Sequence, residues 1–308
     1  MTDTTTQVDP AAIMRIKDLP LRARGVVEGF LSGLHRSPYH GFSVEFSEYR
    51  PYSVGDDPRG LDWKLYARSD RYYVKRFEDE TNRRCHLIVD QSKSMGYGSL
   101  AYTKAEYART LAATIAYYLS LQRDGVGLIT FAETIDQVLP AKHRPGHLRQ
   151  IMAALSRPMS GSTTTLRAPL EHIAQIASRR GLVIIVSDLL VPLDDVAQSL
   201  SLLRARGHEV IILRTLDPAE LRLPSDAPEL IVDMETGKEM YVDPRQAAQA
   251  YAERFSAHRD SLKQICDSRG IDFFEVMTDR PLEASLFDLV AAQTRHRRAS
   301  SSRGGAPR

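Results

Sequence analysis

Short apolar runs alternate with stretches of helical periodicity along most of the chain. From residue 84 onward the apolar runs have the length of buried strands and lie at 85–89, 126–131, 182–187, 209–213 and 271–276. Apolar residues recur at helical spacing at 104–122, 147–156, 167–179, 194–205, 244–268 and 282–293. This alternation predicts a doubly wound, Rossmann-like α/β fold, in which helices cover both faces of a parallel sheet.

Two shorter segments interrupt the alternation. Residues 135–139 form a strand so close behind 126–131 that we expect an antiparallel pair at the edge of the sheet. Residues 230–234 and 240–242 are two short apolar runs that predict a hairpin.

The N-terminal part of the chain has a different character. Residues 11–34 have helical spacing, whereas 35–82 are rich in aromatic residues, glycine, proline and paired charges, which predicts turns and short strands. We therefore predict four parts. They are a disordered or helical leader at 1–19, an extension at 20–82, a main domain at 83–294 and a disordered basic tail at 295–308.

Charge and composition narrow the class of protein. The chain has 41 Lys and Arg against 39 Asp and Glu, a formal charge of +2, and this balance argues against a globally basic nucleic-acid binder. The tail carries several arginines and no acid, so it can attract nucleic acid, anionic lipid or an acidic surface, although a disordered solubilising end is the favoured interpretation. No specific nucleic-acid partner is expected.

The termini and cysteines indicate a soluble, cytoplasmic protein. The first ten residues are polar, and no apolar stretch approaches the ~20 residues of a membrane helix, so we expect no signal peptide and no transmembrane segment. Two cysteines, Cys85 and Cys266, are too few for a disulfide framework or a zinc site, and Cys85 is expected to be a buried thiol.

The residues that follow the predicted strands carry the candidate chemistry. Asp90 ends the first strand of the main domain, and Ser92 and Ser94 come directly after it. A loop before the helix at 167 offers Thr164, and Asp188 follows the most apolar strand. Ligands of open α/β sheets bind beyond the carboxyl ends of the strands, and oxygen ligands suit Mg²⁺ or Mn²⁺. The sequence therefore predicts a divalent-cation site at this edge.

Each ligand also has a structural interpretation. Asp90, Thr164 and Asp188 can each cap a following helix, and the serines can be incidental. The five residues together, in this order and on these elements, favour the metal site. Thr163, Thr164 and Thr165 are adjacent, so which of them is the ligand stays open.

These residues resemble the metal-ion-dependent adhesion site of a von Willebrand factor type A domain, although many such sites have glycine where this chain has Leu189. The preceding stretch resembles, more specifically, the signature of domain-of-unknown-function family 58, which directly precedes such a domain. The matching segments are Glu45-Phe46, Glu48 to Tyr52, Gly55 to Arg59, Leu61 to Trp63 and Tyr73 to Phe77, with Leu203 to Val210 and Thr215 to Glu220 further on. The resemblance covers about 20–294.

The resemblance implies a partner class. Proteins of this type are typically encoded beside MoxR-type AAA+ ATPases and are thought to act as adaptors in chaperone-like maturation or assembly. The oxygen ligands, with no nucleophile or general base beside them, predict that Mg²⁺ at the site docks an acidic side chain of a client protein. The predicted function is thus a metal-dependent protein–protein interaction module and not an enzyme.

The alternative is a metal-dependent hydrolase of phosphoesters that uses the same site. Phosphatase-type sites with a strand-ending aspartate have an acid two residues later, and Ser92 stands there. No nucleotide-binding glycine motif occurs. His143 and His147 are separated by Pro145-Gly146 and are interpreted as exposed loop or cap residues.

The signature in the extension has two interpretations. Its charged and aromatic residues form either a buried network that fixes the extension on the main domain, which is favoured, or a recognition surface. These residues are Arg50, Tyr52, Gly55, Asp56, Asp57, Arg59, Asp62 and Trp63.

Overall fold

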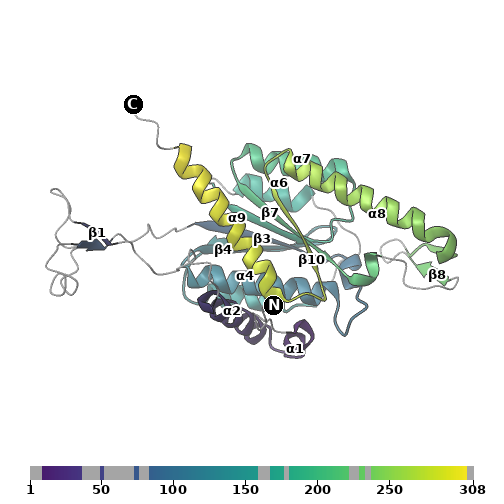
Figure 1. The fold of residues 1–308 in the computed structure, drawn as a ribbon, viewed down its shortest axis with the longest axis horizontal. Coiled ribbons are helices and arrows are strands. Elements are labelled where there is room, and N and C mark those ends of the chain that lie inside the picture. The colour runs from purple at the N-terminus through teal and green to yellow at the C-terminus, as the bar shows by residue number, and fades with distance from the viewer. Residues whose placement is uncertain are drawn as a thin grey trace.

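The protein was analysed as a computed structural model, which describes residues 9–36, 49–51, 73–75, 83–158, 167–176, 180–221, 229–232 and 237–303. Its centre is a six-stranded sheet in the order β10-β7-β6-β3-β4-β5 (Figure 1). The strands are β3 (Arg84–Asp90), β4 (Gly125–Phe131), β5 (Ile135–Lys142), β6 (Leu182–Ser187), β7 (Glu209–Leu216) and β10 (Asp272–Met277). All neighbours are parallel except β4 and β5, so the antiparallel edge pair predicted from the sequence is confirmed.

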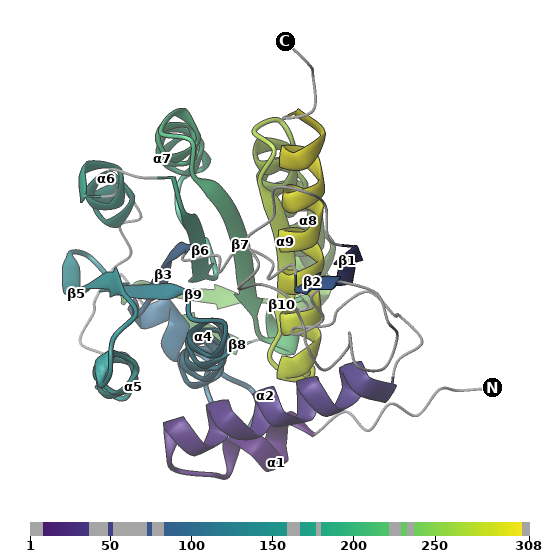
Figure 2. The same cartoon turned by 90° about the vertical axis from the view of Figure 1, so that its left-hand side faces the viewer.

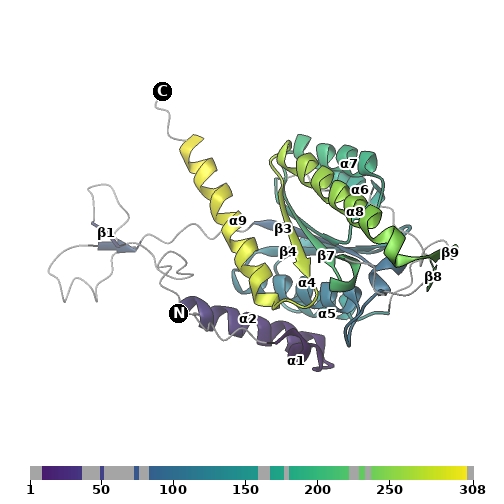
Figure 3. The ribbon, with the colours of Figure 1, turned by 45° about the vertical axis from the view of Figure 1, so that its right-hand side comes forward.

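Helices cover both faces of this sheet (Figures 1 and 3). One face carries α4 (Lys104–Leu121), α5 (His147–Leu155) and α9 (Leu282–Arg303). The other carries α6 (Arg167–Ile176), α7 (Leu193–Ala205) and α8 (Pro244–Asp267). The predicted doubly wound α/β fold is therefore confirmed.

The central strands divide their apolar residues between two cores. On β3, Leu87 and Val89 enter the core under α4, whereas Ile88 enters the core under α7. On β6, Ile184 and Ile185 divide in the same way. Because successive side chains of a strand point to opposite faces, a continuous apolar run is the sequence expected for a strand covered on both sides.

The N-terminal helices lie outside α4 (Figure 2). Asp9 caps α1 (Pro10–Met14), and α2 (Leu19–Arg36) follows. Phe30 of α2 is buried and meets the rings of Tyr118 and Phe287 edge-on, with ring centroids 5.6 and 4.7 Å away. Aromatic contacts of this kind stabilise beyond the area they bury, so α2 shares a core with α4 and α9.

Shorter elements complete the described chain. β1 (Tyr49–Pro51) pairs antiparallel with β2 (Tyr73–Lys75), and β8 (Glu229–Val232) pairs antiparallel with β9 (Glu239–Val242), which confirms the hairpin predicted there. The 3-10 turns η2 (Lys93–Gly96) and η3 (Pro218–Leu221) follow β3 and β7. Within these ranges, no helix is both long enough and apolar enough to cross a bilayer.

The C-terminal tail differs from the prediction. Helix α9 continues through Arg303, where disorder was expected from residue 295. The sequence from Leu282 to Arg303 contains neither glycine nor proline, and arginine and alanine are good helix formers, so nothing in the local sequence ends the helix earlier. Arg295 also reaches back to Asp272 of β10, with Nη2 2.7 Å from the carboxylate. The serines at 300–302 and the glycines at 304 and 305 favoured disorder, but helix propensity and this ion pair favour extension of α9.

The family signature lies almost wholly outside the described residues. Arg50 pairs through its backbone with Val74, and nothing is described of its side chain. The other signature residues fall outside the described ranges, so both interpretations of the signature stay predictions. They are Tyr52, Gly55, Asp56, Asp57, Arg59, Asp62 and Trp63.

Candidate metal-ion site at the carboxyl edge of the sheet

The candidate site lies where the order of the strands reverses. From β3 the chain passes to α4 on one face, whereas from the adjacent β6 it passes to α7 on the opposite face. The two connections diverge at this point, which is where open α/β sheets bind their ligands. Asp90 is the last residue of β3, and Asp188 directly follows β6.

Asp90 is held in place by the loop it begins. Its carboxylate is buried, and Oδ1 accepts a hydrogen bond of 2.8 Å from the backbone N–H of Ser92. Oδ2 accepts a bond of 2.6 Å from the hydroxyl of Ser187, the last residue of β6. The first bond bends the chain after β3, and the second ties the ends of the two strands together.

The two predicted serines lie beside each other in this bend. The hydroxyl oxygens of Ser92 and Ser94 are 3.1 Å apart, with Ser92 buried and Ser94 half-buried. Asp90, Ser92 and Ser94 thus present oxygen atoms from a single turn, as the spacing in the sequence predicts.

Asp188 is fully buried and has a partner for each oxygen. Oδ1 accepts a bond of 3.2 Å from the N–H of Leu190, and Oδ2 lies 2.8 Å from Nζ of Lys104. Leu189, which stands where many related sites have glycine, adopts the left-handed conformation with φ +54°. This conformation is strained for leucine, and its complete burial in the core under α7 holds it there.

The two carboxylates raise the electrostatic energy of this edge. Burial, followed by the negative charge of Asp188, raises the pKa of Asp90 to about 7, although hydrogen bonds from Ser187 and Ser92 act in the opposite direction. Two like charges in a buried position destabilise each other unless a cation is near. The site therefore favours positive charge.

Lys104 supplies one positive charge and was missed from the sequence. It is the first residue of α4, it is completely buried, and its ammonium lies 2.6 Å from Oε1 of Glu220 as well as 2.8 Å from Asp188. Burial acts to lower the pKa of Lys104, but Asp188 and Glu220 outweigh it, so the pKa is raised and the group stays charged. A lysine on the largely apolar buried face of α4, at its first residue, was the signal available in the sequence.

A second buried cation supports Asp188 from β7. Nε of Arg214 donates to the backbone carbonyl of Asp188 at 3.1 Å, and its guanidinium pairs with Glu275 of β10 at 3.2 Å. The ring of Phe255 lies 5.2 Å from the guanidinium carbon. Arg214 thereby fixes the backbone that carries Asp188.

The residues present fit a divalent cation. Asp90 and Asp188 provide carboxylate oxygens and Ser92 and Ser94 provide hydroxyl oxygens, which is the donor set of Mg²⁺ or Mn²⁺. Lys104 contacts Asp188 and Glu220, so with Asp90 ionised three carboxylates outnumber the one ammonium among these four side chains. The described ranges contain no group of three or more His, Cys, Asp or Glu side chains that could hold a metal, so any ion here depends on hydroxyl ligands. Thr164, the remaining predicted ligand, lies outside them.

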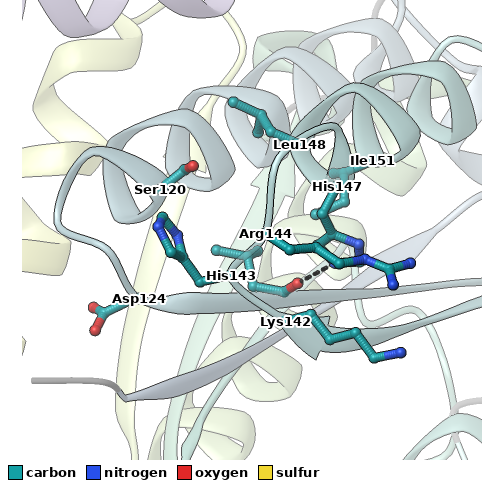
Figure 4. A pocket seen from close by; sticks show the side chains of 9 residues that line it. Ser120, Asp124, Lys142, His143, Arg144, His147, Leu148 and Ile151 are labelled. Atoms are coloured by element: carbon teal, nitrogen blue, oxygen red, sulfur yellow. Dashed lines mark hydrogen bonds between the residues drawn. The ribbon is translucent and has the colours of Figure 1, made fainter.

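A small pocket lies at the amino edge of the sheet, where β4 begins (Figure 4). It has about 210 Å³, part of it open to solvent, and its lining includes Lys142, His143 and His147. His143 is exposed as predicted, but His147 is buried, and its Nε2 lies 2.7 Å from the carbonyl oxygen of Val126. The prediction of two exposed histidines was wrong for His147, because α5 packs its first turn against β4.

The fold and this edge define a class, namely a doubly wound α/β domain with buried oxygen ligands at its switch point. The chain matches the model of the family described as "Protein of unknown function DUF58" over residues 48–261, and it belongs to that family. The family predicted from the sequence is therefore confirmed. The sheet order with its antiparallel edge strand is the doubly wound arrangement that the sequence predicts.

Relatives extend over nearly the whole chain. Uncharacterized proteins of Mycobacterium tuberculosis and Mycobacterium bovis are each 28% identical over 293 residues, which are 93% of this chain and 91% of theirs.

Similar solved structures include an aerotolerance-related membrane protein from Bacteroides fragilis (15% identity, TM-score 0.45) and a conserved hypothetical protein, BatB, from Bacteroides thetaiotaomicron (14%, TM-score 0.43). Each match covers 68% of this chain and 98% of the other. The SpRpn10 VWA domain matches at 13% identity and a TM-score of 0.42, over 66% of this chain and 93% of the domain.

Proposed function

We propose that the protein is a metal-dependent interaction module that docks an acidic side chain of a partner protein at the carboxyl edge of its sheet. The observation that carries the proposal is the pair of buried carboxylates, Asp90 and Asp188, at the switch point with two serine hydroxyls beside them. The ligands would be Asp90, Ser92, Ser94 and Asp188, with Thr164 as predicted from the sequence.

The described residues have distinct roles in this proposal. Mg²⁺, when bound, would supply a coordination position for a carboxylate from outside the chain. Ser187 and the N–H of Ser92 fix the orientation of Asp90, and Arg214 fixes the backbone at Asp188. Because most of these groups are bonded before any ligand arrives, little ordering would be required on docking.

The partner class comes from the family resemblance. We propose that the module is an adaptor for a MoxR-type AAA+ ATPase and an unidentified client, acting in chaperone-like maturation or assembly. An ATP-dependent partner would place this work in the cytoplasm. Membership of the family is the support for this part of the proposal.

Calorimetry of the full chain with MgCl₂ tests the metal site. Asp90→Ala removes one ligand and should abolish the binding heat of the wild type. Asp194→Ala, which removes an exposed carboxylate at the start of α7, is the matched control and should bind as the wild type does. Equal heats from the wild type and Asp90→Ala would refute the metal site.

Affinity capture tests the partner. Recovery of an AAA+ ATPase by the wild type with Mg²⁺, but neither with EDTA nor by Asp90→Ala, would support the adaptor. If the wild type binds Mg²⁺ but captures the ATPase equally with Mg²⁺ and with EDTA, and Asp90→Ala captures it as well, docking does not use the metal.

The alternative is a metal-dependent hydrolase. It predicts that the wild type with Mg²⁺ hydrolyses a phosphoester faster than Asp90→Ala does. Ser92 in the position of the required acid argues against it. A measured difference in rate would replace the docking proposal.

A further inference from the structure

Lys104 contacts one of the proposed metal ligands. Its side chain is completely buried, and its ammonium contacts the same carboxylate, Asp188, that is proposed as a metal ligand. A lysine is almost never fully buried unless it is paired, so the two contacts are the reason that it stays there.

The second contact gives the ammonium an alternative position. Glu220 lies in the 3-10 turn after β7, and its Oε1 is 2.6 Å from Nζ of Lys104. Its Oε2 accepts a bond of 2.8 Å from the N–H of Asp217, and its carbonyl accepts one of 2.7 Å from the hydroxyl of Tyr251. Glu220 is therefore held by the fold, independently of the ammonium.

We propose that Lys104 is a built-in counter-cation that competes with the divalent ion for Asp188, and that Glu220 retains the ammonium when Asp188 turns to the ion. The inference rests on the proposed function, and it adds a regulator to that site. Asp188 would be compensated in both states, by Lys104 in the absence of the ion and by the ion in its presence.

The proposal follows from the charges at this edge. If Asp188 is shared between an ammonium and a dication, the two cations repel each other over a few ångströms at low effective dielectric. The ammonium cannot reach water from its buried position, but it can stay on Glu220 at little cost. The affinity of the site for Mg²⁺ would thus be set by how strongly Lys104 is held at Asp188 relative to Glu220.

Two substitutions should move the affinity for Mg²⁺ in opposite directions. Lys104→Met removes the competing charge and should tighten the binding of MgCl₂ by at least tenfold in calorimetry. Glu220→Gln weakens the alternative position, which leaves the ammonium on Asp188, and should weaken binding by about tenfold. The shift in melting temperature that MgCl₂ causes gives a second readout and should rank the proteins in the same order.

Matched controls separate this effect from a change in net charge. Lys93→Met removes an exposed lysine between Ser92 and Ser94 and should leave the affinity nearly unchanged. Glu275→Gln removes an acid of the same edge that contacts Arg214 and not Lys104, and it should weaken binding less than Glu220→Gln does.

The outcomes are distinguishable. If no variant binds Mg²⁺, Lys104→Met included, the proposed function fails. If the wild type binds and Lys104→Met binds equally or more weakly, only the role of Lys104 fails. If Lys104→Met does not fold, Glu220→Gln and Glu275→Gln test the inference instead. Equal effects of these two substitutions on the affinity for Mg²⁺ would overturn it.

Discussion

The carboxyl edge and the amino edge of the central sheet differ in how deeply their charged side chains are buried. At the carboxyl edge, Asp90, Asp188 and Lys104 are buried together, and Lys104 forms an ion pair of 2.8 Å with Asp188. At the amino edge, the ion pair between Arg83 and Glu209 keeps 29% and 27% of its two side chains exposed. The same strands run between these edges, so the difference does not come from the fold alone.

At the amino edge, a buried titratable side chain stays neutral. Burial, followed by the charges of His208 and Arg84, lowers the pKa of His86 to about 4, so this imidazole is neutral at pH 7. Burying ions is costly, and apolar replacements often stabilise a protein more. The concentration of buried ion pairs at the carboxyl edge is what a functional site that costs the fold stability would show.

The largest expected effect concerns the buried arginine of the carboxyl edge. Arg214→Met should lower the free energy of unfolding by about 3 kcal/mol, because it leaves the Asp188 carbonyl and Glu275 without their partner. Urea denaturation followed by circular dichroism measures the change.

The matched variant at the amino edge sharpens the comparison. Arg83→Met should cost less than about 1 kcal/mol, since its pair with Glu209 is partly solvated. Similar losses from both variants would show that the two edges do not differ in the way their charges are held.

Acidification should destabilise the protein at the amino edge. The unfolded state takes up a proton at His86 near pH 6.5, whereas the folded state takes it up only near pH 4. The stability that neutral His86 provides is complete above pH 6.5 and is lost as the pH falls toward 4. Between pH 7 and pH 5 His86 lowers the free energy of unfolding by about 2 kcal/mol. The raised pKa of Asp90 acts in the opposite direction over the same interval, because the folded state takes up that proton more readily than the unfolded state does.

His86→Leu tests this assignment. It should shift the change in unfolding free energy between pH 7 and pH 5 toward higher stability at pH 5, although burial also lowers the pKa of His208, which acts in the same direction as His86. An unchanged slope in His86→Leu would mean that other groups cause the acid sensitivity.

Features that depend on strand ends and on local periodicity were predictable from the sequence. Asp90 and Asp188 end apolar runs that only strands explain, and parallel strands bring their carboxyl ends to one edge. Ser92 and Ser94 follow within one turn, so their position beside Asp90 is a local property. The antiparallel β5 was predictable because its connection to β4 is too short for a crossover.

The rest depended on contacts between distant segments. Lys104 pairs with Glu220, which lies 116 residues later, and nothing local to either residue indicates the pair. General statistics place lysine at the surface, so its burial could be inferred only from the apolar residues around it on α4. His147 is buried for a similar reason, since its partner is a carbonyl of β4.

The smallest expected effect tests whether the buried carboxylates at the carboxyl edge lower the stability of the fold. In EDTA, Asp90→Asn should raise the free energy of unfolding by about 1 kcal/mol, because it removes one of two like charges from a buried position and keeps side-chain groups for Ser187 and Ser92. In MgCl₂ the order should reverse, since the wild type would gain stability from the bound ion and the variant would not. Thermal melting of the wild type and Asp90→Asn, each in EDTA and in MgCl₂, measures whether their order of stability reverses. If Asp90→Asn is less stable than the wild type in EDTA, the hydrogen bonds of Asp90 outweigh its repulsion from Asp188. The carboxyl edge would then be as well satisfied without metal as the amino edge is.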